Sequence, residues 1–452
     1  MEREKMGSRI GFILLSAGCA IGIGNVWRFP YITGQYGGGA FVLIYLLFLL
    51  IMGVPVMTME LSVGRASRKS VFKSFAELEK KGHKWHLHGY AALIGNYILM
   101  MFYTTVAGWM FHYFYLMLTG QCSGKTPKEF SEMFGSLTGS FPTMALWIVI
   151  VVVLGFMVCS LGLQKGVERI TKWMMSALLV IMLVLAVKSI FTPGGAEGLK
   201  FYLIPDFGRM ADEGIGETII AAMNQAFFTL SLGIGSMAIF GSYIDKKHTL
   251  LGESIRIAGL DTFVAITAGL IIFPACFAYG VNPDSGPDLV FQTLPNIFAE
   301  MAGGRIFGSM FFLFMSFAAF STVIAVFENI VCMDMELTGA SRKKVSMINI
   351  LIMIALSMPC ALGFNVFKDF QPLGAKTNIM DLEDFIVSNL LLPIGCLIYL
   401  LFCVTKYGWG FDKYLAEANT GEGPKLSPKL GFYFKYILPI LIIVILVSGI
   451  VL

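Results

Sequence analysis

Apolar residues recur along the chain in runs of about 20, the length that a helix needs to cross a hydrocarbon core of roughly 30 Å. Polar and turn-forming residues separate these runs and predict eleven spans. The spans are expected at 10–35, 39–62, 89–119, 143–162, 170–191, 216–242, 252–280, 304–337, 344–364, 381–405 and 432–452. The runs do not alternate as the strands of a membrane barrel do, so we expect helices. The pattern therefore predicts an all-α polytopic membrane protein with a single transmembrane domain over residues 1–452.

Composition agrees with this pattern. Of the 452 residues, 56% are hydrophobic and 14% are charged, which overrules the two or three soluble domains that length alone favours. The net charge of +4 does not indicate a nucleic-acid partner, because the positive residues lie in short loops between spans. The expected surroundings are a lipid bilayer, and the sequence leaves the oligomeric state open.

Lysine and arginine are concentrated in alternate loops. They occur in the N-terminal tail, with Arg3 and Arg9, and in the loops after spans 2, 4, 6, 8 and 10, whereas the other loops are poor in them. Because cytoplasmic loops carry such an excess, the N-terminus is expected in the cytoplasm. With an odd number of spans, the C-terminus is expected on the extracellular or periplasmic side of the plasma membrane.

Two spans are interrupted near their middles. Residues 18–31 of span 1 contain three glycines, an asparagine, an arginine and a proline, and residues 224–236 of span 6 contain paired glycines and several hydroxyl residues. Irregular backbone at membrane depth survives only where it lines a cavity or is buried in protein. A packing face of small residues is the alternative for either segment alone. Because the interruptions lie five spans apart, they predict an inverted-repeat transporter with repeats at 10–191 and 216–405 and an additional helix at 432–452.

Several short stretches carry a specific resemblance to a known family. The runs IGIGNVWRFPY at 21–31, GGGAF at 37–41 and FFTLSLGIG at 227–235, with Asp384-Phe385 in span 10, resemble the signatures of the neurotransmitter:sodium symporter family. The resemblance covers the whole chain and is to the bacterial amino-acid transporters of that family. It implies the fold of the bacterial leucine transporter, with broken helices 1 and 6. It also implies sodium-driven uptake by alternating access, in which spans 1, 2, 6 and 7 move against spans 3, 4, 8 and 9.

Gly22 indicates the class of substrate. Monoamine members of the family have an aspartate at this position that engages the amine, so glycine favours a substrate with its own carboxylate. Helix N-termini suit that carboxylate, and unwound carbonyls suit the ammonium. The residues that the resemblance places around the substrate are Ala20, Gly22, Ile23, Gly24, Leu99, Tyr103, Phe228, Thr229, Ser231, Gly233, Ile234, Thr322 and Val326. Most of these side chains are apolar, which favours a hydrophobic or aromatic L-amino acid.

Sodium is a hard cation that prefers oxygen ligands, and the resemblance implies two Na+ sites. The first maps onto the Ala20 carbonyl, Asn25, Thr229 and Asp261, with the substrate carboxylate as a further ligand. The second maps onto the carbonyls of Gly18, Ile21 and Ala318 and the hydroxyls of Ser321 and Thr322.

Asp261 departs from the asparagine that many members of the family have at this place. Chloride-dependent members rely on a bound anion nearby, so a fixed carboxylate beside sodium predicts transport that is independent of chloride. The alternative is that Asp261 lies near the cytoplasmic end of span 7 and is solvated, because span boundaries are uncertain by a few residues.

Charged and polar residues on both sides of these sites are expected to form gates. By resemblance, Arg28 and Asp384 form an outer gate that closes over the substrate, and Gln225 assists it. The residues expected at the inner gate are Arg3 and its acidic partner, Glu336 or Asp334.

Other classes of function remain as alternatives. A proton-coupled amino-acid carrier on the same architecture is the nearest, and a non-transporting receptor or a channel is more distant. Glu328, deep in span 8, either pairs within the core or responds to protonation. An enzyme is not expected, because the spans contain no His-Glu, Ser-Lys or paired-aspartate constellation. The chain also has no G-x-x-x-x-G-K-[ST] phosphate-binding loop, so ATP does not drive it.

Overall fold

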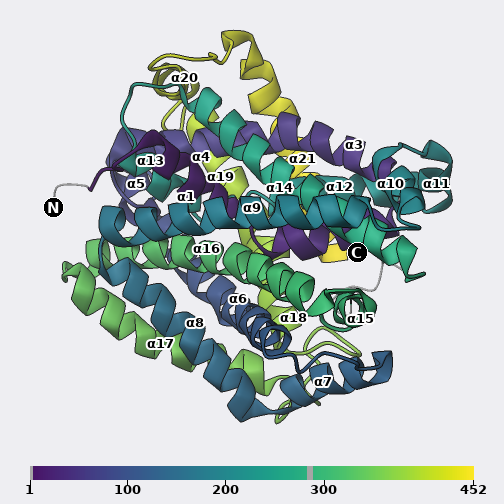
Figure 1. The fold of residues 1–452 in the computed structure, drawn as a ribbon. Helices are drawn as coiled ribbons and strands as arrows, with labels where there is room; N and C mark the ends of the chain where they lie inside the picture. Colours follow the sequence, from purple (N-terminus) through teal and green to yellow (C-terminus); the bar gives the residue numbers. More distant parts are fainter. Residues whose placement is uncertain (1–3, 282–288, 452) are drawn as a thin grey trace.

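The computed structural model describes residues 4–281 and 289–451 (Figure 1). Nearly all of the regular structure in these residues is helical, which confirms the all-α expectation. Some of the spans are divided into consecutive helical segments. The segments that make up the spans are α1 (Arg9–Ala20), η1 (Gly24–Arg28), α2 (Phe29–Gln35), α3 (Gly39–Phe48), η2 (Leu49–Gly53), α4 (Val54–Ser67), α6 (Leu87–Leu118), α8 (Phe141–Ser160), η3 (Leu163–Glu168), α9 (Arg169–Ile190), α12 (Ile215–Phe228), α13 (Ser236–Tyr243), α14 (Leu250–Ala278), α16 (Gly304–Thr338), α17 (Arg342–Leu362), α18 (Ile379–Asp384), η5 (Phe385–Leu391), α19 (Leu392–Val404), η7 (Tyr433–Ile437) and α21 (Leu438–Val451).

Shorter helices lie in the connections. They are α5 (Val71–Leu78), α7 (Pro127–Gly139), α10 (Ala196–Leu203), α11 (Phe207–Asp212), η4 (Leu289–Thr293), α15 (Leu294–Glu300), α20 (Phe411–Ala418) and η6 (Pro428–Leu430).

The described residues contain nine continuous helices long and apolar enough to cross a membrane, and a tenth span if α1 is joined to the helix at Gly24–Gln35 across a bend of 58°. The expected sixth span is present as two shorter helices, α12 and α13, separated by residues 229–235. The expected count of eleven is therefore not confirmed by length and hydropathy. The other ten positions agree, with the main shift at span 5, where η3 starts at Leu163 instead of the expected 170.

The long helices form two packed groups. In one group, α6, α8, α16 and α17 contact one another, and Figure 1 shows them together in the lower part of the bundle. In the other group, α4 packs against α13 and α14, and α1 also contacts α14. α9 lies between the groups and contacts both α14 and α16. This division corresponds to spans 3, 4, 8 and 9 against spans 1, 2, 6 and 7.

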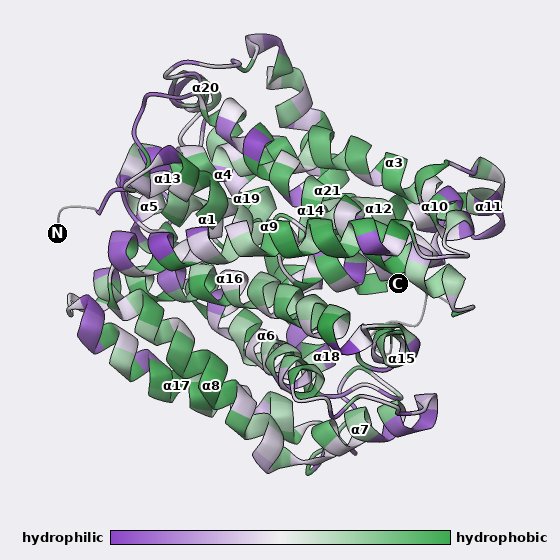
Figure 2. Ribbon diagram, viewed as in Figure 1, coloured by the Kyte–Doolittle hydropathy of each residue, from purple (hydrophilic) through white to green (hydrophobic). Residues whose placement is uncertain are grey.

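Hydropathy divides the molecule along its length. Figure 2 shows hydrophobic residues along the long helices, with hydrophilic residues gathered at the two ends. Several large apolar side chains of α21 are exposed, among them Ile440 and Val447, as expected of a helix that faces lipid. One end carries residues 4–8, α5 and α13, and we call it the N-terminal face. The opposite end carries α2, α7, α10 and α11, and we call it the Arg28 face after the half-buried arginine below it.

Candidate functional site

The break in the first span follows from the local sequence. α1 begins at Arg9 and ends at Ala20, and the preceding Ser8 caps it by accepting a hydrogen bond from the Gly11 N–H. Ile21 is extended, with φ −71° and ψ 100°. In a continuing helix the Gly22 N–H would donate to the Gly18 carbonyl, but here it donates to Asn25 Oδ1 at 3.2 Å. The Gly18 carbonyl is therefore free for a partner outside the helix.

Two hydroxyls of α16 meet the carbonyls that this break releases. Ser321 Oγ lies within hydrogen-bonding distance of two carbonyl oxygens, that of Gly18 at 3.0 Å and that of Ala318 at 2.9 Å. Thr322 Oγ1 lies 3.2 Å from the carbonyl oxygens of both Gly18 and Ile21. The five groups assigned to the second sodium site thus converge, and all their donor atoms are the hard oxygens that sodium prefers.

The side chains assigned to the first sodium site also meet. Asn25 Nδ2 donates to Asp261 Oδ1 at 2.8 Å, and Thr229 Oγ1 donates to Asp261 Oδ2 at 3.1 Å. Asp261 is fully buried in α14, so the alternative of a solvated aspartate is excluded. A buried carboxylate in a membrane span is expected to pair or to serve a function.

The break in the sixth span is longer and has different partners. Residues 229–235 connect α12 to α13, and Ser231, Gly233 and Gly235 have φ values of 50°, 101° and 86°. Residues other than glycine rarely adopt this left-handed backbone conformation. Glu60 of α4 accepts hydrogen bonds from the N–H groups of Gly233 and Met237, each at 2.9 Å. Glu60 is fully buried, and sequence reasoning missed it although a carboxylate inside a span was a usable signal.

A cavity of about 30 Å³ lies between the two breaks. Ten of the thirteen residues expected around the substrate line it: Ala20, Gly22, Gly24, Leu99, Tyr103, Phe228, Thr229, Ser231, Ile234 and Thr322. Cys19 and Leu392 line it as well and were not expected. Of the remaining three, Ile23 lines the neighbouring cavity, Gly233 packs against Leu392 and Cys396, and Val326 is fully buried without lining either cavity. The volume suits one or two water molecules, so a larger ligand requires movement of the lining side chains.

Gly22 lies where no side chain fits. A Cβ atom at this position would approach Thr322 Oγ1 to 2.8 Å and would also collide with the Tyr103 hydroxyl. The Tyr103 hydroxyl accepts a hydrogen bond from the Ile23 N–H at 3.1 Å, so it already contacts the opened backbone. No residue that lines the cavity is acidic.

The expected gate residues on the Arg28 face are near one another but are not bonded. The Arg28 guanidinium lies 4.2 Å from the centre of the Phe228 ring, in a cation–π contact. Asp384 accepts a hydrogen bond from Ser388 Oγ at 2.6 Å. None of the ion pairs in residues 4–281 and 289–451 joins Arg28 to Asp384. Both residues line a cavity of about 230 Å³ between the site and the Arg28 face. Gln225 Nε2 donates to the Gly24 carbonyl at 3.2 Å.

On the N-terminal face, Arg3 lies outside the described residues, so its expected pairing is not seen. Its two expected partners have other contacts. Glu336 accepts hydrogen bonds from the N–H and the hydroxyl of Ser70, at 2.9 and 2.7 Å. Asp334 accepts one from Tyr97 at 2.7 Å and one from Asn349 at 2.8 Å.

Glu328, for which the sequence assigned no partner, is held by two groups. Arg342 at the start of α17 forms an ion pair with it at 2.6 Å, and the Tyr243 hydroxyl donates to it at 2.6 Å. Glu328 therefore pairs within the core, the first of the two alternatives above.

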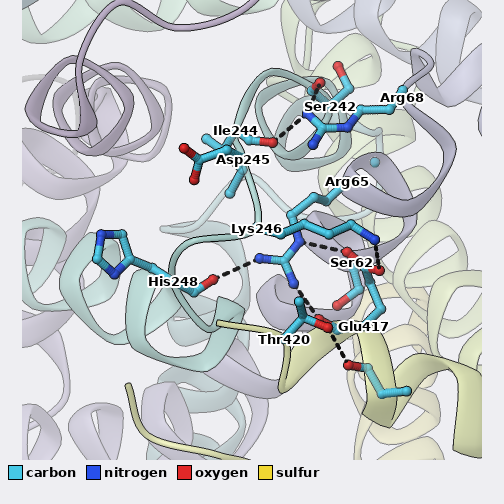
Figure 3. A network of polar contacts seen from close by, with 12 residues as sticks. Ser62, Arg65, Arg68, Ser242, Ile244, Asp245, Lys246, His248, Glu417 and Thr420 are labelled. Carbon is cyan, nitrogen blue, oxygen red and sulfur yellow. Dashed lines mark hydrogen bonds and ion pairs between the residues drawn. The ribbon is translucent and has the colours of Figure 1, made fainter. Parts of the chain in front are cut away.

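A network of ion pairs and hydrogen bonds connects α20 to the N-terminal face. Arg65 at the end of α4 is fully buried and forms an ion pair with Glu417 of α20 at 2.7 Å. Its other nitrogens donate to the carbonyls of His248, at 2.8 Å, and of Glu417. Lys246 pairs with the second carboxylate oxygen of Glu417 at 2.9 Å (Figure 3). The connection between α13 and α14 is thus fastened both to α4 and to α20.

Comparison with known proteins agrees with this geometry. The model of the "Sodium:neurotransmitter symporter family" matches residues 3–131 and 128–452. Two relatives described as uncharacterized sodium-dependent transporters are YhdH of Bacillus subtilis, 33% identical over 98% of this chain and 96% of the relative, and a protein of Haemophilus influenzae, 30% identical over 99% and 98%. The sodium-dependent serotonin transporter of Drosophila melanogaster is 25% identical over 99% of this chain and 76% of its own length.

A solved structure matches the fold as a whole. The crystal structure of MhsT in complex with L-phenylalanine has a TM-score of 0.88 and is 35% identical, covering 99% of this chain and 100% of MhsT. The expected leucine-transporter-like fold with two broken helices is therefore confirmed. The chain belongs to the sodium:neurotransmitter symporter family and is a polytopic, sodium-dependent secondary transporter, not an enzyme.

Proposed function

We propose that the protein imports a hydrophobic or aromatic L-amino acid together with sodium, through two Na+ sites and without chloride. The observation that carries the proposal is the hydrogen bond from the Ile23 N–H, in the opened backbone, to the Tyr103 hydroxyl, beside a cavity without an acidic lining residue. A ligand amine there finds carbonyls and no counter-carboxylate, so the ligand must supply its own. The binding of L-phenylalanine by MhsT supports the same class.

The coupling to sodium is proposed to occur in the two oxygen clusters. Asn25, Thr229 and Asp261 would hold one ion together with the substrate carboxylate, and Ser321 and Thr322 with the carbonyls of the first break would hold the other. Ions bound beside the substrate raise its affinity, and the substrate raises theirs by the same factor. The N-terminal face is proposed to be cytoplasmic, with Arg28 and Asp384 closing the opposite side. The two five-span repeats, 10–191 and 216–405, remain part of this proposal.

Uptake by proteoliposomes tests the proposal. We expect L-phenylalanine or a related L-amino acid to accumulate under an inward sodium gradient and to fail to accumulate when choline replaces sodium. Uptake under a pH gradient without sodium would instead establish the proton-coupled alternative. Binding without accumulation would establish a receptor.

Asp261 provides a test of chloride independence. We expect wild-type uptake to stay within about twofold when gluconate replaces chloride. Asp261→Asn is expected to lower uptake in gluconate by about tenfold, because the charge of a bound sodium then has no fixed counter-charge in a buried site, and chloride is expected to restore part of it. The control is Asp245→Asn, which removes an exposed carboxylate that pairs with Lys247 at 3.6 Å. Loss of wild-type uptake in gluconate would contradict the proposal.

A further inference from the structure

Two asparagines from the helix group of α6, α8, α16 and α17 hold the break in span 6. Asn96 of α6 donates from Nδ2 to the Ile234 carbonyl at 2.9 Å. Asn329 of α16 donates to Asn96 Oδ1 at 3.0 Å and lies 3.4 Å from the same Ile234 carbonyl. Both asparagines are fully buried. The Ile234 carbonyl is a group that the missing helical turn leaves without a partner, and these amides satisfy it.

Ile234, whose carbonyl they hold, lines the cavity of about 30 Å³ between the two breaks. The Ile234 side chain lines that cavity together with Leu99 and Tyr103 of α6. Asn96, Leu99 and Tyr103 follow one another at spacings of three and four, so they share one face of α6. From Tyr103 to Asn96 the helix advances about 10 Å along its axis. Tyr103 contacts the opened backbone at Ile23, so Asn96 and Ile234 mark the end of the site away from that contact.

The same short segment is held from both helix groups. Glu60 of α4 binds the N–H groups on either side of Ile234, at Gly233 and Met237. Asn96 binds the Ile234 carbonyl from α6. On the α6 side, the space at Gly95 is also filled, since a Cβ there would lie 3.3 Å from Ile234 Cγ2. The position of Ile234 is thus set by directed bonds from both helix groups and by close packing on the α6 side.

The asparagine pair is costly to bury. Asn329 Oδ1 has no hydrogen-bond partner in the described structure, and an unpartnered buried acceptor destabilises a fold. Two apolar side chains of similar size would remove that unpartnered acceptor, but they would leave the Ile234 carbonyl buried without a partner and without a directed bond to hold it. The benefit of the amides is therefore the position of that carbonyl.

We infer that Asn96 and Asn329 are positioning residues that fix Ile234 and thereby set which side-chain lengths the substrate site accepts. The inference rests on the proposed function, in which the ligand is an amino acid. With the pair in place, Ile234 has one fixed position, which limits how long a substrate side chain the site accepts. Without it, Ile234 can retreat or advance, and the preference between long and short substrates changes.

The test measures binding of L-alanine, L-valine, L-leucine, L-phenylalanine and L-tryptophan in sodium, with Asn96→Ala, Asn329→Ala and the wild type. The matched control is Asn349→Ala, which removes a buried amide of α17 bonded to Asp334, to the Val345 carbonyl and to the Tyr97 hydroxyl of α6; Asn349 does not line the cavity. We expect the ratio of affinities for the longest and shortest bound amino acids to change by at least about fivefold in both pair variants, which corresponds to about 1 kcal/mol. The control is expected to keep the wild-type ratio even if its overall affinity falls.

The outcomes separate this inference from the proposed function. A wild type that binds none of the series in sodium overturns both. A wild type that binds, with ratios in the pair variants within twofold of it or equal to those of Asn349→Ala, overturns the inference alone. If Asn329→Ala does not fold, Asn329→Ser replaces it, because its hydroxyl is too short to reach both partners in the same way and the same shift in ratio is expected.

Discussion

The break in span 1 and the break in span 6 differ in length and in the kind of group that satisfies them. The first occupies residues 21–23 and the second residues 229–235. In the first, three hydroxyls meet the released groups: Thr322 and Ser321 donate to carbonyls, and Tyr103 accepts from an N–H. The Gly22 N–H is the exception, because it donates to the amide oxygen of Asn25. In the second, the released groups meet a carboxylate and an amide, those of Glu60 and Asn96.

This difference separates ion-dependent from ion-independent parts of the site. A hydroxyl is both a donor and an acceptor and rotates about its C–O bond, so Thr322 can release a carbonyl and offer its own oxygen to a cation. A carboxylate that accepts two backbone N–H bonds has no such alternative role. We therefore expect the first break to respond to sodium and the second to keep its shape with or without it.

The largest expected effect is that of Glu60→Ala. It leaves the N–H groups of Gly233 and Met237 buried without partners, and each such group costs about 1–3 kcal/mol. We expect the melting temperature of Glu60→Ala in detergent to fall, and the decrease to be similar with and without sodium. The melting temperature of Glu60→Gln is expected to fall less, because glutamine keeps one acceptor oxygen. A loss confined to sodium-containing buffer would contradict the division between the two breaks.

Thr322→Val is expected to have an intermediate effect, restricted to sodium. The substitution keeps the shape of the side chain and removes the hydroxyl that faces Gly18 and Ile21. We expect the sodium concentration for half-maximal substrate binding to rise about tenfold, equivalent to about 1.4 kcal/mol. Ser316→Ala on the same helix is the control, because the Ser316 hydroxyl donates to the Phe312 carbonyl of its own helix, at 2.7 Å, and not to the first break. An equal rise in both variants would assign the effect to α16 in general.

Tyr103→Phe is expected to have the smallest effect of the three. It removes one hydrogen bond to the Ile23 N–H, and a typical bond of this kind contributes about 1 kcal/mol. We expect substrate affinity to fall about fivefold, as 1 kcal/mol requires. Thermal stability without substrate is expected to fall less than in Glu60→Ala, because one N–H group instead of two loses its partner. Unchanged affinity would show that the hydroxyl serves only the first break and not the ligand.

Local sequence was informative for the first break. Gly18, Gly22 and Asn25 lie within one or two turns of each other, so their effect on the helix can be read from their spacing. The positions of the other spans followed from hydropathy in the same way. The sequence also located the sixth span. The segment between α12 and α13, residues 229–235, is so long that the two helices do not count as one continuous span.

Long-range pairing was much less accessible. The sequence leaves Glu328 without a partner, and the structure gives it Arg342 and Tyr243. Glu60 lies in a span whose sequence does not point to residues 233–237. Arg28 and Asp384, expected as a closing pair, face a common cavity instead of each other. In each case the choice of partner depends on how distant helices pack.

By itself, the sequence determined that the chain crosses a membrane as helices, that two of these helices are interrupted, and which backbone groups the first interruption releases. These properties depend on hydrophobic runs and on neighbouring residues, which are local. The family resemblance had already grouped the hydroxyls of Ser321 and Thr322 with the carbonyls of the first break, and the structure brings them together. The tertiary structure alone decided that Glu60 and Asn96 satisfy the atoms released at the second break. A buried polar group requires a hydrogen-bond partner. Neighbouring residues determine which groups require one, but these partners come from helices that are distant in the sequence.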